Sequence, residues 1–219
     1  MLSRRIGALA PVMLVLLGGG DGVAPTAPSL IAKWTLDDGA AVSGVPGMPD
    51  GRVIRATAAA GHTGGALGFE DWSTRNYLKP DPAAATRVVI SHDAKLNPSL
   101  PFRVTAWVHP AADPVYMGGI VEKGQGYGAS YRLLLLRGLK VEGCLGERHV
   151  CVRSASPIGL NAWHEVTLRA DGKSLTLTVD GAVAGSTPID APPKLASTEA
   201  LVIGDRFTGR IDEVSISND

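Results

Sequence analysis

The feature that most constrains the fold of this chain is a series of short apolar segments, separated by tight turn signals, in its C-terminal part. Ser174–Val179 alternates between polar and apolar side chains, the pattern of a strand with one buried face. Asp171-Gly172 precedes this segment and Asp180-Gly181 follows it, and both pairs are typical of hairpin turns. The pattern predicts an antiparallel meander with strands at 166–168, at 175–179 and near Val183.

Short strands and turn residues continue through the whole chain from about residue 30, and no segment has the length and period of an amphipathic helix. Residues 102–108 alternate, with Val104, Ala106 and Val108 on one face and Trp107 on the other. The apolar run at 131–136 predicts a strand buried on both faces. We therefore expect one all-β domain over residues 30–219, built as a two-sheet antiparallel jelly-roll sandwich.

Composition excludes some classes of partner. Lysine plus arginine and aspartate plus glutamate number 21 each, so the net charge is zero. A neutral chain exerts no long-range attraction on nucleic acid or on an anionic membrane. Neither is expected as a partner, and the sequence does not define an oligomeric state.

The first residues resemble a secretory signal. Arg4 and Arg5 precede a short apolar stretch that ends before Gly18-Gly19-Gly20. This stretch is too short for a membrane-spanning helix and contains Pro11. We predict a signal peptide over residues 1–27, cleaved between residues 20 and 27, and a secreted protein; association with the cell envelope stays open.

The two cysteines, Cys144 and Cys151, lie between strand-like runs. In an exported chain they predict a disulfide across a hairpin, which contributes roughly 2–3 kcal/mol on the chain-entropy estimate. The alternative is a metal site that adds His149, but that set lacks a fourth ligand.

Several motifs, in strict order, resemble the laminin-G-like, concanavalin A-like jelly rolls of exported bacterial proteins. In chain order they are Trp34-Thr35-Leu36-Asp37-Asp38, Gly65-Ala66-Leu67-Gly68-Phe69-Glu70, the strand at 102–108, Ile120-Val121-Glu122-Lys123-Gly124, Trp163-His164-Glu165-Val166, Val179-Asp180-Gly181 and Gly209-Arg210-Ile211-Asp212-Glu213-Val214. The resemblance covers nearly all of the chain after the signal segment and implies the same sandwich fold. It implies less about activity, because such sandwiches include lectins, adhesion modules and a few hydrolases.

Asp212 is the most informative single residue. The period-two rule places it on the same face as Val214 and Ile216, so its carboxylate should approach the core and needs partners there. The resemblance implies a structural calcium ion that clamps the first and last strands, held by Asp212 with Asp37 or Asp38, and by Glu70. The alternative is that Asp212 bonds to Arg210, to Arg206 or to backbone amides, without a metal.

Aromatic residues are the candidate ligand contacts, because exposed rings pack on sugar C–H groups. By their family positions, Trp34, Trp107 and Trp163 are expected in the core, and His164 is expected to be a hydrogen-bonded core residue. The predicted ligand-binding residues lie in loops: Trp72, Arg75 and Tyr77 in a lengthened polar loop, and Tyr116 and Tyr127 near a glycine-rich segment.

Catalytic patterns are missing from the sequence. It contains no Glu-x-Asp-x-Glu, no Gly-x-Ser-x-Gly and no His-Glu-x-x-His. The leading hypothesis is a secreted, non-catalytic, lectin-like module that binds a glycan or a glycosylated surface through loops at one end or a concave sheet. The alternatives are a protein-binding adhesion module of the same fold and, third, a glycan hydrolase or lyase that depends on Glu70 or Glu122.

Overall fold

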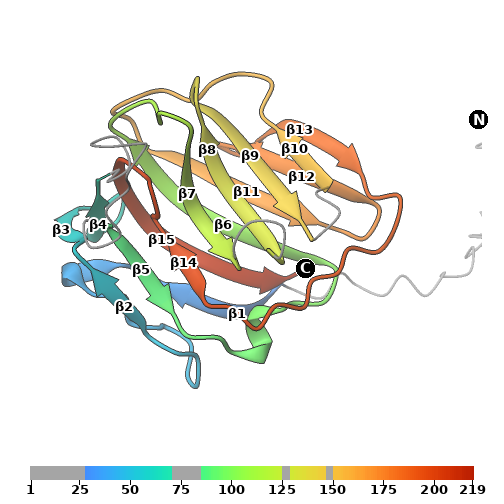
Figure 1. Cartoon of the computed structure of the whole chain (residues 1–219), viewed down its shortest axis with the longest axis horizontal. Helices are drawn as coiled ribbons and strands as arrows, with labels where there is room; N and C mark the ends of the chain where they lie inside the picture. Colours follow the sequence, from blue (N-terminus) through green and yellow to red (C-terminus); the bar gives the residue numbers. More distant parts are fainter. Residues whose placement is uncertain (1–27, 71–84, 125–128, 147–149) are drawn as a thin grey trace, which may run out of the picture.

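The structure is a computed structural model that describes residues 28–70, 85–124, 129–146 and 150–219. Two antiparallel sheets pack face to face, as Figure 1 shows. Apart from short 3-10 turns such as Asp37–Gly39 and Ala94–Leu96, the regular elements of these residues are strands. The predicted all-β sandwich is confirmed. Among the described residues, no helix has the length and apolar character needed to cross a bilayer.

The larger sheet, called here the large sheet, has eight strands. Its order is β13 (Ala182–Pro188), β12 (Ser174–Val179), β11 (His164–Ala170), β6 (Phe102–Pro110), β15 (Gly209–Asn218), β4 (Gly65–Phe69) and β3 (Thr57–Ala60), with β1 (Ser29–Trp34) also paired to β15.

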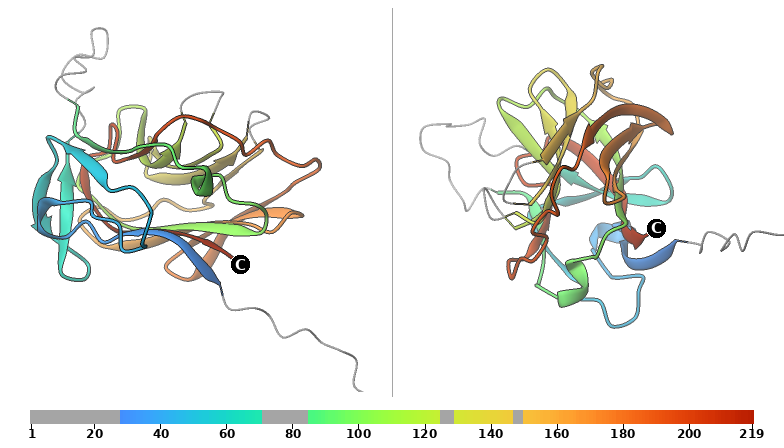
Figure 2. Two further views of the ribbon diagram at one scale, coloured as in Figure 1. Left: turned by 90° about the horizontal axis from the view of Figure 1, so that it is seen from below. Right: turned by 90° about the vertical axis from the view of Figure 1, so that its right-hand side faces the viewer.

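The other sheet, called the small sheet, has seven strands. Its order is β10 (Val150–Arg153), β9 (Lys140–Leu145), β8 (Tyr131–Leu136), β7 (Met117–Lys123), β14 (Leu201–Ile203), β5 (Arg87–Ile90) and β2 (Gly51–Ile54). The side views in Figure 2 show the two layers of strands edge-on.

The predicted meander is present as β11, β12 and β13. Thr167 lies opposite Thr178 and Leu168 opposite Leu177 in the antiparallel register. Asp180 and Gly181 have φ values of 51° and 77°, the left-handed conformation that a two-residue hairpin turn requires at both central positions. The sequence pattern therefore identified both the strands and the turn.

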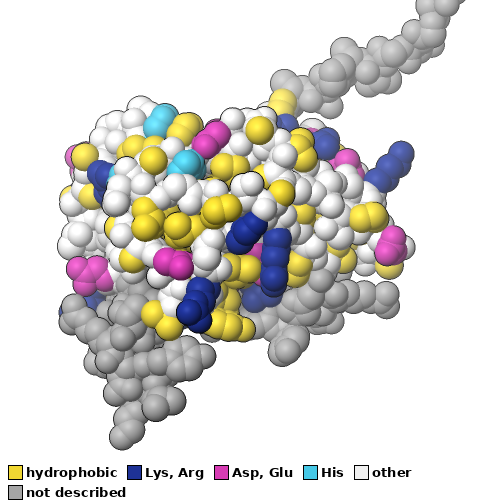
Figure 3. All heavy atoms as spheres, turned by 90° about the horizontal axis from the view of Figure 1, so that it is seen from above, with side chains coloured by type: hydrophobic (Ala, Val, Ile, Leu, Met, Phe, Trp, Pro, Cys, Tyr) yellow, Lys and Arg dark blue, Asp and Glu magenta, His cyan; other side chains and the backbone are white. Residues whose placement is uncertain are grey.

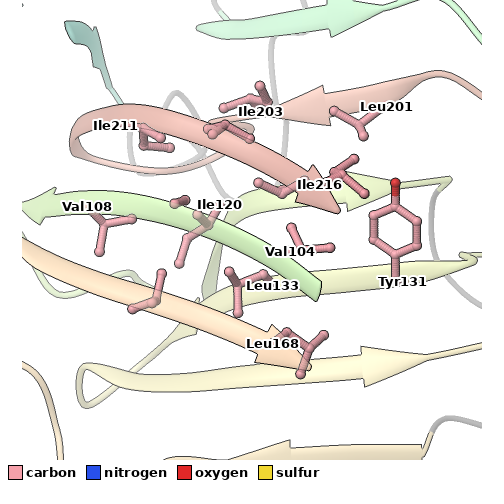
Figure 4. Packing of buried hydrophobic residues seen from close by; sticks show 14 of the residues in the cluster. Val104, Val108, Ile120, Tyr131, Leu133, Leu168, Leu201, Ile203, Ile211 and Ile216 are labelled. Atoms are coloured by element: carbon pink, nitrogen blue, oxygen red, sulfur yellow. The ribbon is translucent and has the colours of Figure 1, made fainter. Parts of the chain in front are cut away.

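The core fills the space between the sheets. Val104, Val108 and Leu168 from the large sheet meet Ile120 and Leu133 from the small sheet, and all of them are fully buried (Figure 4). On β8, one face is fully buried, but on the other only Leu134 is buried, so the predicted burial of both faces holds only in part. Truncating one of these large side chains to alanine typically costs about 2–5 kcal/mol.

The first and last strands are neighbours. Ser29 pairs with Asn218, and Trp34 pairs with Val214. The Trp34 side chain is fully buried, which confirms its predicted place in the core, and its indole N–H donates to the Pro49 carbonyl at 3.2 Å.

A β-bulge in β15 corrects the predicted orientation of Asp212. Ile211 lies opposite Val108 and Asp212 opposite Trp107, but the next pair is Ser215 with Thr105. Glu213, at a φ of 50°, supplies the extra residue. Because directly paired side chains share a face, Asp212 lies on the outer face with Trp107 rather than with Val214.

The predicted disulfide is present. Cys144 and Cys151 are directly paired between β9 and β10, and their sulfurs are bonded. Glu142 lies close to both sulfurs, but cysteines joined in a disulfide offer no thiolate to a metal. His149, the residue that the alternative required, lies outside the described residues, as does the predicted signal peptide.

Candidate functional site

Three connections meet at one end of the sandwich, called here the loop end: 111–116, 137–139 and 154–163. Backbone hydrogen bonds join them: the Arg137 N–H donates to Tyr116 at 3.0 Å, and the Ile158 N–H donates to Leu139 at 2.9 Å. The Asn161 N–H also donates to the Pro110 carbonyl, at 2.8 Å. These bonds fix the loops relative to one another, so side chains on them have defined positions.

The loop end exposes large apolar side chains. Tyr116 is 64% exposed, Val115 46% and Leu160 41%. In Figure 3, which looks onto this end, hydrophobic side chains are interspersed with charges of both signs. Tyr116 is therefore available to a ligand, as its predicted role requires. The other predicted contacts, Trp72, Arg75, Tyr77 and Tyr127, lie outside the described residues, so the predicted groove between these rings stays a prediction.

A group of rings and one guanidinium adjoins the loop end on the outer face of the large sheet. We call it the Trp163 cluster: Trp163, Trp107, His62, His109 and Arg210. The ring of His62 stacks on Trp107 with a centroid distance of 3.4 Å, and His109 meets Trp163 edge-on at 5.3 Å. The Arg210 guanidinium carbon lies 5.3 Å from the centroid of the Trp163 ring, a cation–π contact.

This cluster corrects the expectation that Trp107 and Trp163 belong to the core. Both are only partly buried, and Trp107 lies on the face opposite Val108. The alternation in residues 102–108 already placed Trp107 opposite the core residues, and that signal was more reliable than the family position.

His109 has an unusual environment in the cluster. Its Nδ1 atom is buried and has no hydrogen-bond partner among the described residues. Partial burial, and then the positive charge of Arg210, lower the pKa of the imidazole. His109 is therefore biased toward the neutral form beside a fixed cation.

Asp212 positions the turn between β3 and β4. One of its carboxylate oxygens accepts the N–H groups of His62 at 2.8 Å and Thr63 at 3.1 Å, and the other accepts the N–H of Glu213 at 2.8 Å. The residue is fully buried, and this burial raises the pKa of its carboxyl, an effect that the N–H donors partly offset. By fixing the backbone of His62, Asp212 holds the imidazole over Trp107.

Asp37 holds the same turn from the other side. Its carboxylate accepts the Gly65 N–H at 2.6 Å, and this bond, with one from Thr35, lowers the pKa of the Asp37 carboxyl. Gly64 has a φ of 67°, and a Cβ placed there would lie 2.8 Å from the Asp37 carboxylate. The turn thus requires glycine at 64, and the acids near the two ends of the domain meet at one hairpin.

These contacts bear on the predicted calcium ion. Calcium needs lone pairs from six to eight oxygens. Here backbone N–H groups donate to the carboxylates of Asp212 and Asp37. These bonds occupy oxygen lone pairs and stabilise the negative charges without a cation. Asp38 and Glu70 are exposed on neighbouring segments. The donor set on the two clamping carboxylates does not fit calcium, and calcium binding stays an untested prediction.

His164 is satisfied by the protein itself. Its Nδ1 lies 2.8 Å from an Asp180 carboxylate oxygen, and its Nε2 accepts the Gly159 N–H at 3.1 Å. With both nitrogens engaged, this histidine fixes the start of β11, in agreement with the expected structural role.

The outer face of the small sheet carries paired charges. Glu122 is only 4% exposed; burial raises the pKa of its carboxyl, whereas Arg206, at 3.8 Å, opposes that rise. Arg206 also bonds to Asp205 at 3.2 Å, and Arg87 lies 3.4 Å from the same aspartate. Sequence reasoning singled out Glu122 and named Arg206 only as an alternative partner of Asp212, because the residues of this charge network are distant along the chain.

A hollow of about 410 Å³ lies at the opposite end of β15. Leu30, Lys95 and Asn97 are among the residues that line it, and no aromatic ring is among them. It therefore fits a sugar less well than the loop end does.

Comparisons with known proteins agree with this fold. The model of the laminin-G-type family described as the concanavalin A-like lectin/glucanases superfamily matches residues 83–219. The chain therefore belongs to this superfamily. Among curated protein sequences, none matches the chain significantly.

Solved structures with the same fold include domain 4 of AbnA, a GH43 extracellular arabinanase from Geobacillus stearothermophilus, in complex with arabinotriose. The TM-score is 0.66 at 13% identity, over 87% of this chain and 93% of that one. The binding domain of Paraclostridial Mosquitocidal Protein 1 has a TM-score of 0.70 at 10% identity, over 87% of this chain and 49% of that one.

The binding domain of botulinum neurotoxin DC in complex with SialylT is also similar, with a TM-score of 0.66 at 9% identity over 86% of this chain and 48% of that one. This chain thus spans about half the length of the two toxin binding domains. At these identities the likeness shows the fold alone.

Proposed function

We propose that the protein is an exported, non-catalytic module that binds carbohydrate at the loop end. The observation that carries the proposal is the ring of Tyr116, which stands 64% exposed on a loop tied by backbone hydrogen bonds to its neighbours. A rigid exposed ring packs on pyranose C–H groups with little loss of conformational entropy, and nearby polar groups orient the hydroxyls. The disulfide fits an oxidising compartment outside the cytosol.

The structural neighbours support a glycan as the first ligand class to test. The arabinanase domain was solved with arabinotriose and the neurotoxin domain with SialylT. Those ligands belong to those proteins. They indicate that a sandwich of this shape can present a sugar site.

The test is a glycan array followed by calorimetry on wild type and variants. Tyr116→Ala should weaken binding about tenfold or more, as loss of an aromatic contact at a binding surface typically does. Tyr116→Phe keeps the ring and should retain most of the affinity. Val183→Ala, which alters a side chain 70% exposed on β13, is the matched surface control and should bind like wild type. A folded protein that binds no glycan would contradict the proposal.

A second candidate function is protein binding at the same end. Val115, next to Tyr116, and Leu160, on another connection of the loop end, add exposed aliphatic surface, which favours a protein partner more than a sugar. Capture of a defined extracellular protein, abolished by Leu160→Ser and unaffected by free sugars, would favour this function. Turnover of a polysaccharide, lost in Glu122→Gln, would instead favour an enzyme.

A further inference from the structure

Arg210 is a cation that the described residues fix in place without giving it an acidic partner. Its guanidinium donates to the Ala60 carbonyl at 2.9 Å and lies over the Trp163 ring. In the part of the chain that the structure describes, no carboxylate forms an ion pair with it. A guanidinium has five N–H donors in a fixed plane, so a carbonyl and a ring leave most of them available.

The nearest acid on the same strand does not neutralise this charge. Asp212 lies two residues along β15 on the same outer face, but its oxygens accept the N–H groups of His62, Thr63 and Glu213. The β3–β4 turn therefore covers the carboxylate completely while Arg210 stays partly exposed. Glu165, another acid on this face, lies opposite Trp107 on β11, with β6 between it and β15. Glu213 pairs with Lys33, and Asp219 pairs with two other arginines.

Several other arginines are paired with carboxylates, which distinguishes them from Arg210. Those with a carboxylate partner are Arg87 and Arg206 on Asp205, Arg103 and Arg169 on Asp219, and Arg153 on Glu142. In these pairs the cation is used within the fold. At Arg210 the neutral aromatic ring positions the guanidinium and leaves its positive charge uncompensated.

We propose that Arg210 recognises the carboxylate of an acidic sugar, such as a uronic or a sialic acid, bound across the Trp163 cluster and the loop end. This inference rests on the proposed function and names the class of glycan. The planar fork of the guanidinium matches a carboxylate with two parallel hydrogen bonds. Leu160 and Trp163 lie on the same connection, 154–163, so a sugar anchored at Arg210 would extend toward the exposed side chains of the loop end.

The two histidines complete the polar part of the site. His62 is exposed and stacked on Trp107, and it can donate to a sugar oxygen. The unpartnered Nδ1 of His109 lies at the edge of the Trp163 ring.

The experiment compares acidic sugars with their neutral counterparts by calorimetry. One pair is oligogalacturonate and its methyl ester, and the other is sialyllactose and lactose. The acidic member of at least one pair should bind wild type about tenfold more tightly, with affinity that falls as salt rises. Arg210→Gln should remove this preference, so that the acidic and the neutral member of each pair bind this variant with similar affinity. Arg210→Lys should retain part of it, since it keeps the charge but not the fork.

Arg52→Gln is the matched control, because it removes an exposed arginine from β2 of the small sheet. It should keep the preference for acidic sugars. Near-ultraviolet circular dichroism checks that each variant is folded. Equal binding of acidic and neutral sugars, or an unchanged preference in Arg210→Gln, would overturn the inference and leave the proposed function intact. Failure of wild type to bind any glycan would overturn both.

Discussion

The region around Glu122 on the small sheet and the Trp163 cluster on the large sheet use charge in opposite ways. On the small sheet, Glu122 is buried beside Arg206, and Asp205 contacts both Arg206 and Arg87. On the large sheet, the Trp163 cluster holds Arg210 against a ring and a carbonyl. The first arrangement satisfies buried charges within the fold, whereas the second leaves a fixed cation at the surface.

The difference teaches which polar groups contribute to stability and which are available to a ligand. Removing one member of a buried charge pair leaves the other without a partner and destabilises the fold. Removing an exposed cation from a ring costs little stability, because water replaces it. Mutations in the Glu122 region should therefore change the free energy of unfolding, whereas mutations of Arg210 should change ligand binding.

The largest expected effect on stability is at Arg206. Arg206→Met leaves the Glu122 carboxylate buried without its cation, and because Arg206 is 30% exposed we expect a loss of about 2–3 kcal/mol. Urea unfolding at pH 7 measures it. Adding Glu122→Gln to this variant should recover most of the loss, since a neutral amide then replaces the buried carboxylate that lost its cation. An unchanged midpoint in the single variant would show that the pairing on the small sheet is not structural.

Asp212→Ala should cost about 2 kcal/mol, because three backbone N–H groups lose their acceptor. The matched control is Asp190→Ala, which removes an exposed acid and should cost less than about 0.5 kcal/mol. The same experiment addresses calcium. If N–H donors occupy the carboxylates, adding calcium or a chelator leaves the unfolding midpoint of wild type unchanged. A rise with calcium that Asp212→Ala abolishes would establish the ion.

The ion pairs of Asp219 with Arg103 and Arg169 should contribute less to stability, and their contribution should depend on pH. Burial opposes the ionisation of Asp219, but Arg103 and Arg169 lower the pKa of its carboxyl below the ordinary 3.8. Its contribution is therefore present above that value and is lost as pH falls through the folded pKa. Asp219→Asn should cost less than about 1 kcal/mol at pH 7, and its stability should decline less than that of wild type between pH 5 and pH 3, in the same unfolding assay. An identical decline would contradict the assignment.

Glu122 should show the opposite pH dependence to Asp219, because the pKa of its carboxyl is raised rather than lowered. Burial raises the pKa of this carboxyl, so its neutral form is favoured in the fold and its contribution is lost as pH rises through the folded pKa. Glu122→Gln should therefore gain stability relative to wild type as pH rises from 4 to 7. A loss of relative stability over that range would show that the Arg206 pairing outweighs burial.

The smallest effect on stability is expected for Arg210→Gln. The residue is partly exposed and has no acidic partner among the described residues, so the free energy of unfolding should change by less than about 0.5 kcal/mol. Thermal and urea unfolding measure this change. A loss above about 2 kcal/mol would mean that Arg210 mainly supports the fold.

Much of the fold could be predicted from the sequence because its signals are local. The alternation in β12, the Asp180-Gly181 turn and the disulfide spacing depend on neighbouring residues, and the structure confirms all three. The orientation of Asp212 was predicted wrongly, because one bulge residue, Glu213, reverses the face, and no alternation rule locates a bulge in advance.

The site was less predictable because it combines distant segments. Arg210 meets Trp163, and His62 meets Trp107, only after β15, β6 and the β3–β4 turn have come together. The exposure of Tyr116 agrees with its predicted role, whereas the placement of Trp107 and Trp163 in the core was wrong. The predicted contacts between 71 and 84 and at Tyr127 remain predictions.

The central claim is that a glycan binds at the loop end and at the Trp163 cluster rather than on the small sheet. Amide chemical shifts of isotope-labelled protein, titrated with the glycan that binds most tightly, test this directly. The account predicts shifts that concentrate in 111–116, 157–163 and the start of β15, with the small-sheet amides near Glu122 unchanged. Shifts centred on Glu122 and Arg206, with none around Tyr116 and Arg210, would contradict it.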